Sequence, residues 1–445
     1  MPRLVLIYPA TGKVPGREFV RTWQQEPLAI GVLAALTPDE WEISFFDDRM
    51  ERIDYDIDAD LVGISIETYT ARRGYQIAAR FRDKGIPVVF GGCHATFMPD
   101  EALEHGDAVC VGEAEKVWES ILDDTLAGRL EGRYKADSWT DFEDVAVDRG
   151  IFDGKRYLPL TLVETGRGCP NKCEFCSISA FFRSTYRGRA PESIVREIKE
   201  AGSKYIFFVD DNFTGDLKRA RELCDAVKPL KVKWMTQASV SGLGDPDFTR
   251  LMAESGCMAL LIGFESLDEK NLASMNKRFN RVEDYSKILA NLRENRIFVY
   301  GTFVFGYPSD TRRSFEESVD FAVREKMFIA AFNHLVPFPG TPLYAELESG
   351  KRLKYDKWWL SSEFRFGQTP FEPEPFSSSE LEGMCLESRR DFFSFGSILR
   401  RMTDFKCNCA TPMSFFRYFG LNLLMRKEVS GKFGIPLGEI DGPEV

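Results

Sequence analysis

The chain has 445 residues, 44% of them hydrophobic, which is enough for more than one buried core. Its formal net charge of −11 argues against nucleic acid as the main partner, because binding a phosphate backbone requires a basic surface. No apolar run is long enough for a transmembrane helix and the N-terminus lacks a secretory signal, so we expect a cytoplasmic protein.

Strand and helix signals alternate over the first 135 residues. Apolar runs predict strands at 4–8, 43–46, 61–66, 87–90 and 108–111, with helices over 26–36, 72–84 and 113–126. Strict alternation predicts a parallel, doubly wound sheet, which binds ligands beyond the carboxyl ends of its strands. We therefore expect a Rossmann-like domain over 1–135, followed by a polar linker over 136–157.

A second alternation runs from 158 to 342 and contains six strand signals. They lie at 160–164, 205–209, 232–235, 259–263, 298–305 and 330–336, with helical patterns between them. Six strand–helix units favour a partial (βα)6 barrel, although periodicity alone does not distinguish it from a second flat sheet.

Residues 343–445 are expected to form a separate, mostly helical region. The simplest interpretation of its aromatic residues is that they cover the open side of the barrel, and the alternative is a lid over an apolar substrate. Basic side chains beside these rings also favour peripheral contact with an anionic membrane surface. They are Arg400, Arg401, Arg417, Arg426 and Lys427.

Three of the ten cysteines lie close together in a C-x3-C-x2-C pattern formed by Cys169, Cys173 and Cys176. Thiolates are soft ligands that suit zinc or an iron–sulfur cluster. Structural zinc requires four ligands, usually in two separated pairs, and no further Cys or His follows before Cys224. Three thiolates on a four-iron cluster would leave one iron open to another ligand, and we favour the cluster.

This pattern, with Phe175 before the last cysteine, resembles the radical S-adenosylmethionine (SAM) superfamily over residues 158–340. The resemblance implies an oxygen-sensitive [4Fe-4S] cluster on the three cysteines, which cleaves SAM to a 5′-deoxyadenosyl radical. It also implies a one-electron donor such as flavodoxin or ferredoxin. The residues expected to contact SAM are Asp210, Asp211, Asn212, Gln237, Glu265, Ser266 and Gly301.

The N-terminal domain resembles the cobalamin-binding subclass of radical SAM enzymes in its segments 91–96 and 112–115. The D-x-H-x-x-G motif, whose histidine replaces the lower axial base in many cobalamin proteins, is absent. His94 is therefore interpreted as a packed or tail-contacting residue rather than a cobalt ligand, and a domain that has lost its corrin remains the alternative. The residues expected at the cobalamin site are Ser65, Thr68, Gly91, Gly92, His94, Thr96, Gly112 and Glu113.

Together the two resemblances imply a cobalamin-dependent methyltransferase that acts on an unactivated carbon of a small or apolar substrate. One SAM would supply the methyl group through cobalamin, and a second would supply the radical. Ring formation, ring contraction and carbon–carbon coupling are alternatives within the same machinery. A corrinoid or cluster carrier without turnover is the alternative from another class, and formation of 5′-deoxyadenosine distinguishes it.

Overall fold

The computed structural model describes residues 1–14, 24–141, 143, 145–429, 431, 433–440, 442–443 and 445. The chain divides into two compact units. The N-terminal unit comprises Met1–Leu158 and two later segments, Tyr355–Phe366 and Gly434–Val445. The barrel unit comprises Pro159–Lys354 and Gly367–Phe433.

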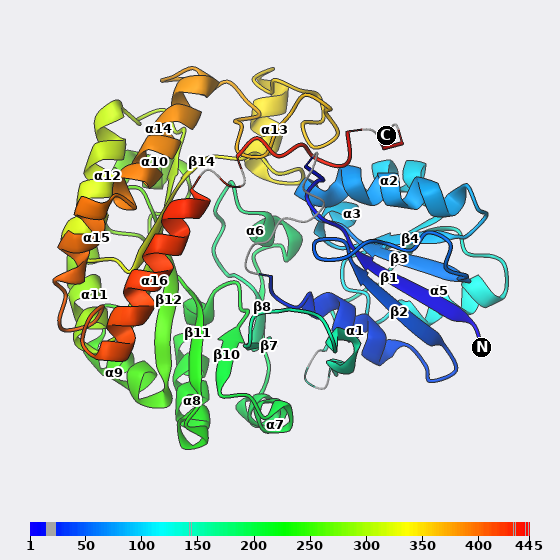
Figure 1. The fold of residues 1–445 in the computed structure, drawn as a ribbon, viewed down its shortest axis with the longest axis horizontal. Coiled ribbons are helices and arrows are strands. Elements are labelled where there is room, and N and C mark those ends of the chain that lie inside the picture. The colour runs from blue at the N-terminus through cyan, green and yellow to red at the C-terminus, as the bar shows by residue number, and fades with distance from the viewer. Residues whose placement is uncertain are drawn as a thin grey trace. The chain divides into compact units, whose positions relative to one another are not determined.

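The N-terminal unit contains a parallel sheet of six strands in the order β2-β1-β3-β4-β5-β6, with helices on both faces (Figure 1). The order reverses between β1 and β3, which makes the sheet doubly wound, as predicted. Its strands are β1 (Arg3–Tyr8), β2 (Glu42–Asp47), β3 (Leu61–Ser65), β4 (Val88–Gly91), β5 (Ala108–Val111) and β6 (Gly132–Lys135). Its helices are α1 (Leu28–Leu36), α2 (Ala71–Arg82), α3 (Cys93–Phe97), α4 (Pro99–His105) and α5 (Trp118–Leu126).

The segment after β5 belongs to this sheet and its core. Strand β6 pairs with β5 in parallel, although its residues alternate between half-buried and exposed and include no apolar run. Further along, Phe152 is buried in the hydrophobic core, and the Tyr157 hydroxyl donates to Asp47 at 2.8 Å. Although the composition of 136–157 is polar, Phe152 and Tyr157 of this segment pack against the domain.

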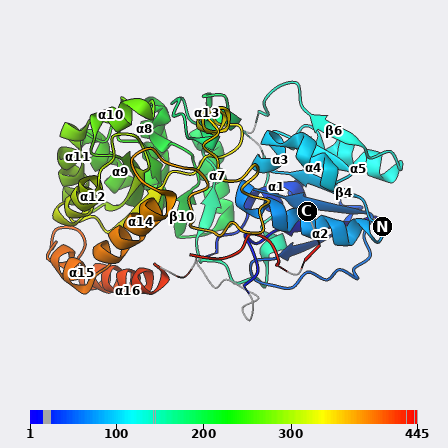
Figure 2. The ribbon, with the colours of Figure 1, turned by 90° about the horizontal axis from the view of Figure 1, so that it is seen from above.

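The barrel unit contains a parallel sheet in which six strands follow one another in chain order, with β7 and β14 at its edges. Because crossovers between parallel strands are almost always right-handed, sequential order places all connecting helices on one face, and the sheet curls into an open barrel (Figure 2). The strands are β7 (Thr161–Val163), β10 (Tyr205–Phe208), β11 (Lys233–Ala238), β12 (Cys257–Glu265), β13 (Phe298–Phe305) and β14 (Ile329–His334). The helices are α6 (Ser177–Phe181), α7 (Pro191–Ala201), α8 (Leu217–Val227), α9 (Pro246–Ser255), α10 (Glu269–Ser274), α11 (Val282–Glu294) and α12 (Arg312–Arg324).

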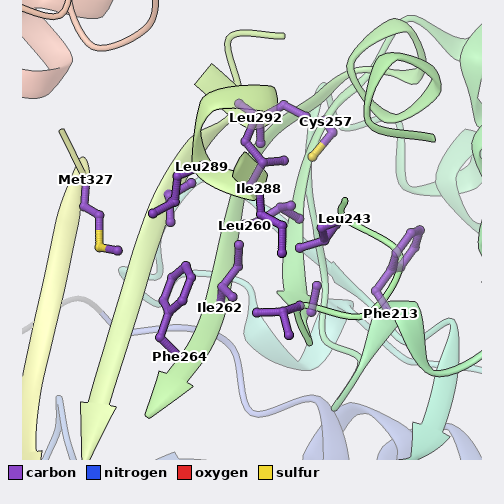
Figure 3. Close-up of a cluster of buried hydrophobic side chains, with 14 of the residues drawn as sticks. Phe213, Leu243, Cys257, Leu260, Ile262, Phe264, Ile288, Leu289, Leu292 and Met327 are labelled. Atoms are coloured by element: carbon purple, nitrogen blue, oxygen red, sulfur yellow. The ribbon is translucent and has the colours of Figure 1, made fainter. Parts of the chain in front are cut away.

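The main core of this unit lies between the strands and the surrounding helices. Figure 3 shows Leu260, Ile262 and Phe264 of β12 projecting toward Ile288 and neighbouring residues of α11. Side chains on a strand alternate between its two faces, so one face of each strand builds this layer while the other faces the barrel interior. Burial of this apolar surface supplies the largest stabilising contribution to the fold.

The C-terminal helices are α13 (Pro342–Ser349), α14 (Ser378–Phe392), α15 (Phe395–Met402) and α16 (Pro412–Glu428). Helix α14 contacts β14 and α12, and its Leu381, Cys385 and Phe392 belong to the barrel core. It therefore completes the layer of helices around the barrel. Among the described residues, no helix is long and apolar enough to cross a membrane.

Arg401 joins the C-terminal helices to the barrel. Its side chain is fully buried, and its guanidinium donates to the carbonyls of Met327, Phe328 and Phe392 at 2.9–3.1 Å. It also donates to the Asn422 amide oxygen at 3.0 Å and lies 3.7 Å from the centroid of the Phe392 ring. Burial lowers the pKa of Arg401 to about 10.

Replacing Arg401 with methionine is expected to reduce the free energy of unfolding by about 3 kcal/mol, because several buried acceptors lose their donor. The neighbouring exposed Arg400→Met variant should change it by less than about 0.5 kcal/mol. Urea unfolding followed by circular dichroism measures both. Equal stability of the two variants would show that the Arg401 contacts contribute little.

Candidate active site

The three cysteines occupy the loop that follows β7, as the sequence predicts. The loop runs between a small strand, β8 (Gly166–Gly168), and helix α6. Cys169 follows β8, Cys176 is the N-cap of α6, and the Cys176 amide donates to the Cys173 carbonyl at 3.2 Å. All three thiols are free, with Cys173 buried and the other two half-buried.

The three thiols suit a four-iron cluster, which binds each thiolate through a different iron and leaves the fourth iron open to another ligand. Burial raises the pKa of Cys173 to about 12, while Lys277 lowers it and the two other thiols raise it.

Asp210 binds the backbone at the start of the cysteine loop. It follows β10 and is completely buried, and its carboxylate accepts hydrogen bonds from the amides of Thr165 and Gly166 at 2.8 and 3.0 Å. The Thr165 hydroxyl donates to its second oxygen. Burial raises the pKa of Asp210, and the hydrogen bonds from Thr165 and the charge of Arg219 oppose this shift. In this structure Asp210 positions the loop, and the SAM contact expected for it stays a prediction.

The next two residues also contact the loop. Asp211 accepts from the Gly168 amide at 2.9 Å, and burial raises its pKa to about 6. The Asn212 amide lies 3.4 Å from the Cys169 sulfur, and its oxygen accepts from the Ser239 amide at 3.0 Å. The Asp-Asp-Asn segment therefore connects the cysteine loop to the ends of β10 and β11.

Glu265 ends β12 and forms a buried ion pair with Lys277 at 2.5 Å. Its backbone has a φ of 64°, a left-handed conformation that costs a non-glycine residue energy and recurs at functional sites. The segment that carries Lys277 is attached to the cysteine loop, because the Asn276 amide donates to the Lys172 carbonyl at 2.7 Å. The Glu174 amide also donates to the Met275 carbonyl at 3.3 Å. A cation is thereby held beside the thiols, which the sequence analysis did not predict.

Replacing Lys277 with methionine is expected to reduce the free energy of unfolding by about 3 kcal/mol, since the carboxylate of Glu265 would remain buried without its partner. The double variant Glu265→Gln/Lys277→Met should recover part of this loss. Urea unfolding of the cluster-free protein measures both, with Lys228→Met as a control that breaks an exposed pair with Glu254. A double variant less stable than Lys277→Met would contradict the buried-pair account.

The remaining residues predicted to contact SAM lie on neighbouring strands. Gln237 is near the end of β11, on the strand face opposite to the buried Trp234 and Thr236. Ser266 follows β12 and its hydroxyl accepts from the Asp268 amide at 3.0 Å. Gly301 lies within β13, and a Cβ there would stand 2.6 Å from the Met327 sulfur, so that side chain would have to shift.

In the N-terminal unit, the residues predicted to bind cobalamin gather at the carboxyl ends of three adjacent strands. Ser65 ends β3, Gly91 ends β4 and Gly112 follows β5. The Thr96 hydroxyl accepts from the Gly112 amide at 2.9 Å and donates to the Gly92 carbonyl at 2.9 Å. One network therefore connects the two glycine segments beyond the carboxyl ends of the strands, the edge where such sheets bind ligands.

Two glycines shape this edge in different ways. Gly92 has a φ of 95°, and a Cβ there would lie 2.6 Å from the Ile66 carbonyl oxygen, so another residue would displace the loop. Gly112 has a φ of 88°, but a Cβ there would meet no atom within 4 Å. The backbone at Gly112 thus borders open space, which fits the approach of a large flat ligand. Glu113 beside it accepts from the Thr140 amide at 2.7 Å.

His94 is fully buried, and both ring nitrogens have partners. They lie 3.3 Å from the Thr68 hydroxyl and 3.0 Å from a Glu101 oxygen. Glu101 also accepts from Trp359 at 2.9 Å and pairs with Lys357 at 3.1 Å, which attaches the segment Tyr355–Phe366 to this unit. Burial would raise the pKa of Glu101, but His94, Trp359 and Lys357 lower it to about 2. These contacts support the interpretation of His94 as a packed residue rather than a cobalt ligand.

Two family models match the chain, the B12 binding domain over residues 24–122 and the radical SAM superfamily over residues 163–322. The bacteriochlorophyllide d C-8(2)-methyltransferase of Chlorobaculum tepidum is 33% identical over 361 residues, which cover 75% of this chain and 79% of that relative. The bacteriochlorophyllide d C-12(1)-methyltransferase of the same organism is 30% identical over 389 residues, which cover 84% of this chain and 84% of that relative.

Among solved structures, the radical SAM methyltransferase TsrM from Kitasatospora setae, with cobalamin and a [4Fe-4S] cluster bound, has a TM-score of 0.64. The match covers 79% of this chain and 75% of that one at 19% identity, which supports the fold. The sequence likeness to the two curated relatives extends over most of each chain and includes both domains. The chain belongs to the cobalamin-dependent radical SAM methyltransferases, enzymes whose cofactors are SAM, a [4Fe-4S] cluster and cobalamin.

Proposed function

We propose that this enzyme transfers a methyl group to an unactivated alkyl carbon of an apolar substrate, and that a tetrapyrrole is the first candidate to test. The observation that carries the proposal is the set of contacts that Asp210, Asp211 and Asn212 make with the cysteine loop. The same chain has a glycine-lined edge, formed by Gly91, Gly92 and Gly112 at the carboxyl ends of β4 and β5. The named activities of the two Chlorobaculum relatives on bacteriochlorophyllide d support the choice of substrate class.

When bound, the cluster supplies the electron that cleaves SAM, and cobalamin carries the methyl group. In our proposal the thiols of Cys169, Cys173 and Cys176 hold the cluster, and Asp210 keeps their loop in place. Asp211, Asn212, Gln237, Glu265, Ser266 and Gly301 are proposed to border SAM. Ser65, Thr68, Gly91, Gly92, His94, Thr96, Gly112 and Glu113 are proposed to form the cobalamin site and the packing beneath it. The proposal includes a cytoplasmic location and a flavodoxin or ferredoxin as electron donor.

The test is an anaerobic reaction of the enzyme, reconstituted with iron, sulfide and hydroxocobalamin, with bacteriochlorophyllide d, reduced flavodoxin as the electron donor, and SAM that carries a trideuterated methyl group. We expect pigment that has gained one labelled methyl group, with one S-adenosylhomocysteine and one 5′-deoxyadenosine for each product molecule. Consumption of pigment with 5′-deoxyadenosine but no label would instead indicate ring-forming or coupling chemistry. Unchanged pigment would remove the tetrapyrrole from the proposal, and the absence of 5′-deoxyadenosine would favour a carrier.

A further inference from the structure

Helix α16 exposes large apolar side chains to solvent. Its buried residues are the polar Ser414, Tyr418 and Asn422, spaced four residues apart, and Asn422 meets Arg401 of the same unit. Phe419 and Leu421 pack partly buried beside them. The exposed face of the helix carries Met413 and Phe416, which are 62% and 69% exposed. The exposed face of a surface helix is normally polar.

Helix α15 continues this surface. It buries Ile398 together with Ser397 and Arg401, but it exposes Phe395 and Leu399 by 56% and 52%. The Arg426 guanidinium of α16 lies 4.5 Å from the centroid of the Phe395 ring, so the exposed faces of the two helices adjoin. We call this surface the α15–α16 patch. Its apolar members, including one residue of the connecting loop, are Phe395, Leu399, Phe405, Met413, Phe416 and Leu424.

These six side chains are half of the exposed large hydrophobic residues among the described parts of the chain, although they lie within thirty positions. Exposed cations accompany them, namely Arg400, Lys406, Arg417, Arg426 and Lys427. The acidic residues between 395 and 428 are Asp404, which is buried, and Glu428, which is half-buried. The patch is therefore basic in a chain with a net charge of −11.

We propose that the α15–α16 patch binds the surface of a membrane that contains anionic lipids. Short helices with aromatic and aliphatic residues on one face, bordered by Arg and Lys, insert their apolar side chains at the level of the lipid headgroups. The long basic side chains extend toward the phosphates while their hydrocarbon stems stay apolar. This inference is independent of the proposed reaction, because it concerns a surface outside the cysteine loop and the glycine-lined edge.

The charges favour lipid over a second copy of this chain as the occupant. A two-fold symmetric dimer through the patch would bring the same five cations of both copies together, and the Glu294 carboxylate, 3.9 Å from Lys406, compensates one of them in each copy. An anionic bilayer provides the opposite charge for every cation and an apolar layer for every exposed ring.

Flotation or sedimentation with vesicles tests the proposal on the full chain. Vesicles of phosphatidylcholine alone are compared with vesicles of equal parts phosphatidylcholine and phosphatidylglycerol. We expect binding to the anionic vesicles that weakens at high salt. The Phe405→Ser/Phe416→Ser variant should bind at least about tenfold more weakly, because two aromatic rings leave the interface. The Arg417→Glu/Lys427→Glu variant should lose a similar factor on anionic vesicles.

The matched controls are Leu126→Ser on α5, at a side chain that is 58% exposed, and Lys218→Glu on α8, at one that is 88% exposed. Both should bind vesicles as the unchanged chain does. Failure of the unchanged chain to bind anionic vesicles at low salt, or equal losses in the controls, would overturn the proposal. A dimer in light scattering that Phe405→Ser/Phe416→Ser converts to a monomer, without vesicle binding, would assign the patch to a second copy.

Discussion

Replacing any one of Cys169, Cys173 and Cys176 with alanine is expected to abolish formation of 5′-deoxyadenosine from SAM. Each thiol supplies one of the three protein ligands in the proposed cluster site, and two thiolates cannot retain a four-iron cluster with one iron open to SAM. The loss should be complete within detection. Iron content and 5′-deoxyadenosine formation after anaerobic reconstitution measure the effect.

The matched control for this series is Cys409→Ser, at a half-buried thiol on the loop between α15 and α16. It should retain the iron content of the unchanged chain and its rate of SAM cleavage. Iron retained in all three alanine variants would contradict the assignment of the cluster. Iron lost in Cys409→Ser would make that residue a ligand and reopen the question of the fourth coordination site.

Replacing Asp210 with alanine is expected to reduce the free energy of unfolding by about 3 kcal/mol and to prevent stable incorporation of iron. Its carboxylate accepts from two backbone amides and one hydroxyl in a site without solvent, so its removal leaves these donors unsatisfied. The Asp210→Asn variant should lose less, since its side-chain oxygen can still accept from both backbone amides while its NH2 group donates to the Thr165 hydroxyl.

The two effects are separable. Urea unfolding of the cluster-free protein reports the stability of the loop support, and iron content reports the geometry of the thiols. Asp245→Ala, which removes the N-cap of α9, serves as a control that should lose about 1 kcal/mol and keep its iron. Normal iron content in Asp210→Ala would show that the cysteine loop keeps its shape without this carboxylate.

The barrel and the doubly wound sheet could be predicted because both leave a strong periodic signal. Apolar runs such as 298–305 end at polar or glycine residues, and their alternation with helices determines a parallel sheet. The choice between a flat sheet and a barrel was not accessible from periodicity, because it depends on the order of the strands. Only the structure shows that the second sheet keeps chain order while the first reverses beside β1.

The components that escaped prediction are stabilised by partners distant in sequence. Strand β6 has no apolar run, and it is stabilised by parallel pairing with the edge of β5. The segment Tyr355–Phe366 joins the N-terminal unit through Trp359 and Lys357, which meet a glutamate more than 250 positions earlier. Neither residue type nor spacing along the chain signals such contacts, which depend on the completed fold.

For the candidate site, the sequence predicts the three cysteines as cluster ligands but says less about how their loop is supported. Asp210 is predicted to contact SAM by its place after β10, and the structure shows in addition that its carboxylate accepts from the amides of Thr165 and Gly166 at the start of the loop. The alternation of strands and helices predicts that a residue lies at a strand end. It does not predict where the side chain points, because that depends on which neighbouring groups need a hydrogen-bond partner in the folded structure. Lys277 was missed for a related reason, since a single lysine in a loop is usually exposed to solvent.

The most direct test of the account is the metal content of the full chain after anaerobic reconstitution with iron, sulfide and hydroxocobalamin, followed by desalting. The account predicts about four irons and about one cobalt per chain, with loss of iron in the cysteine variants and retention of cobalt. Four irons without cobalt would contradict it, because the glycine-lined edge of the first unit would then not bind the cofactor that the proposed methyl transfer requires.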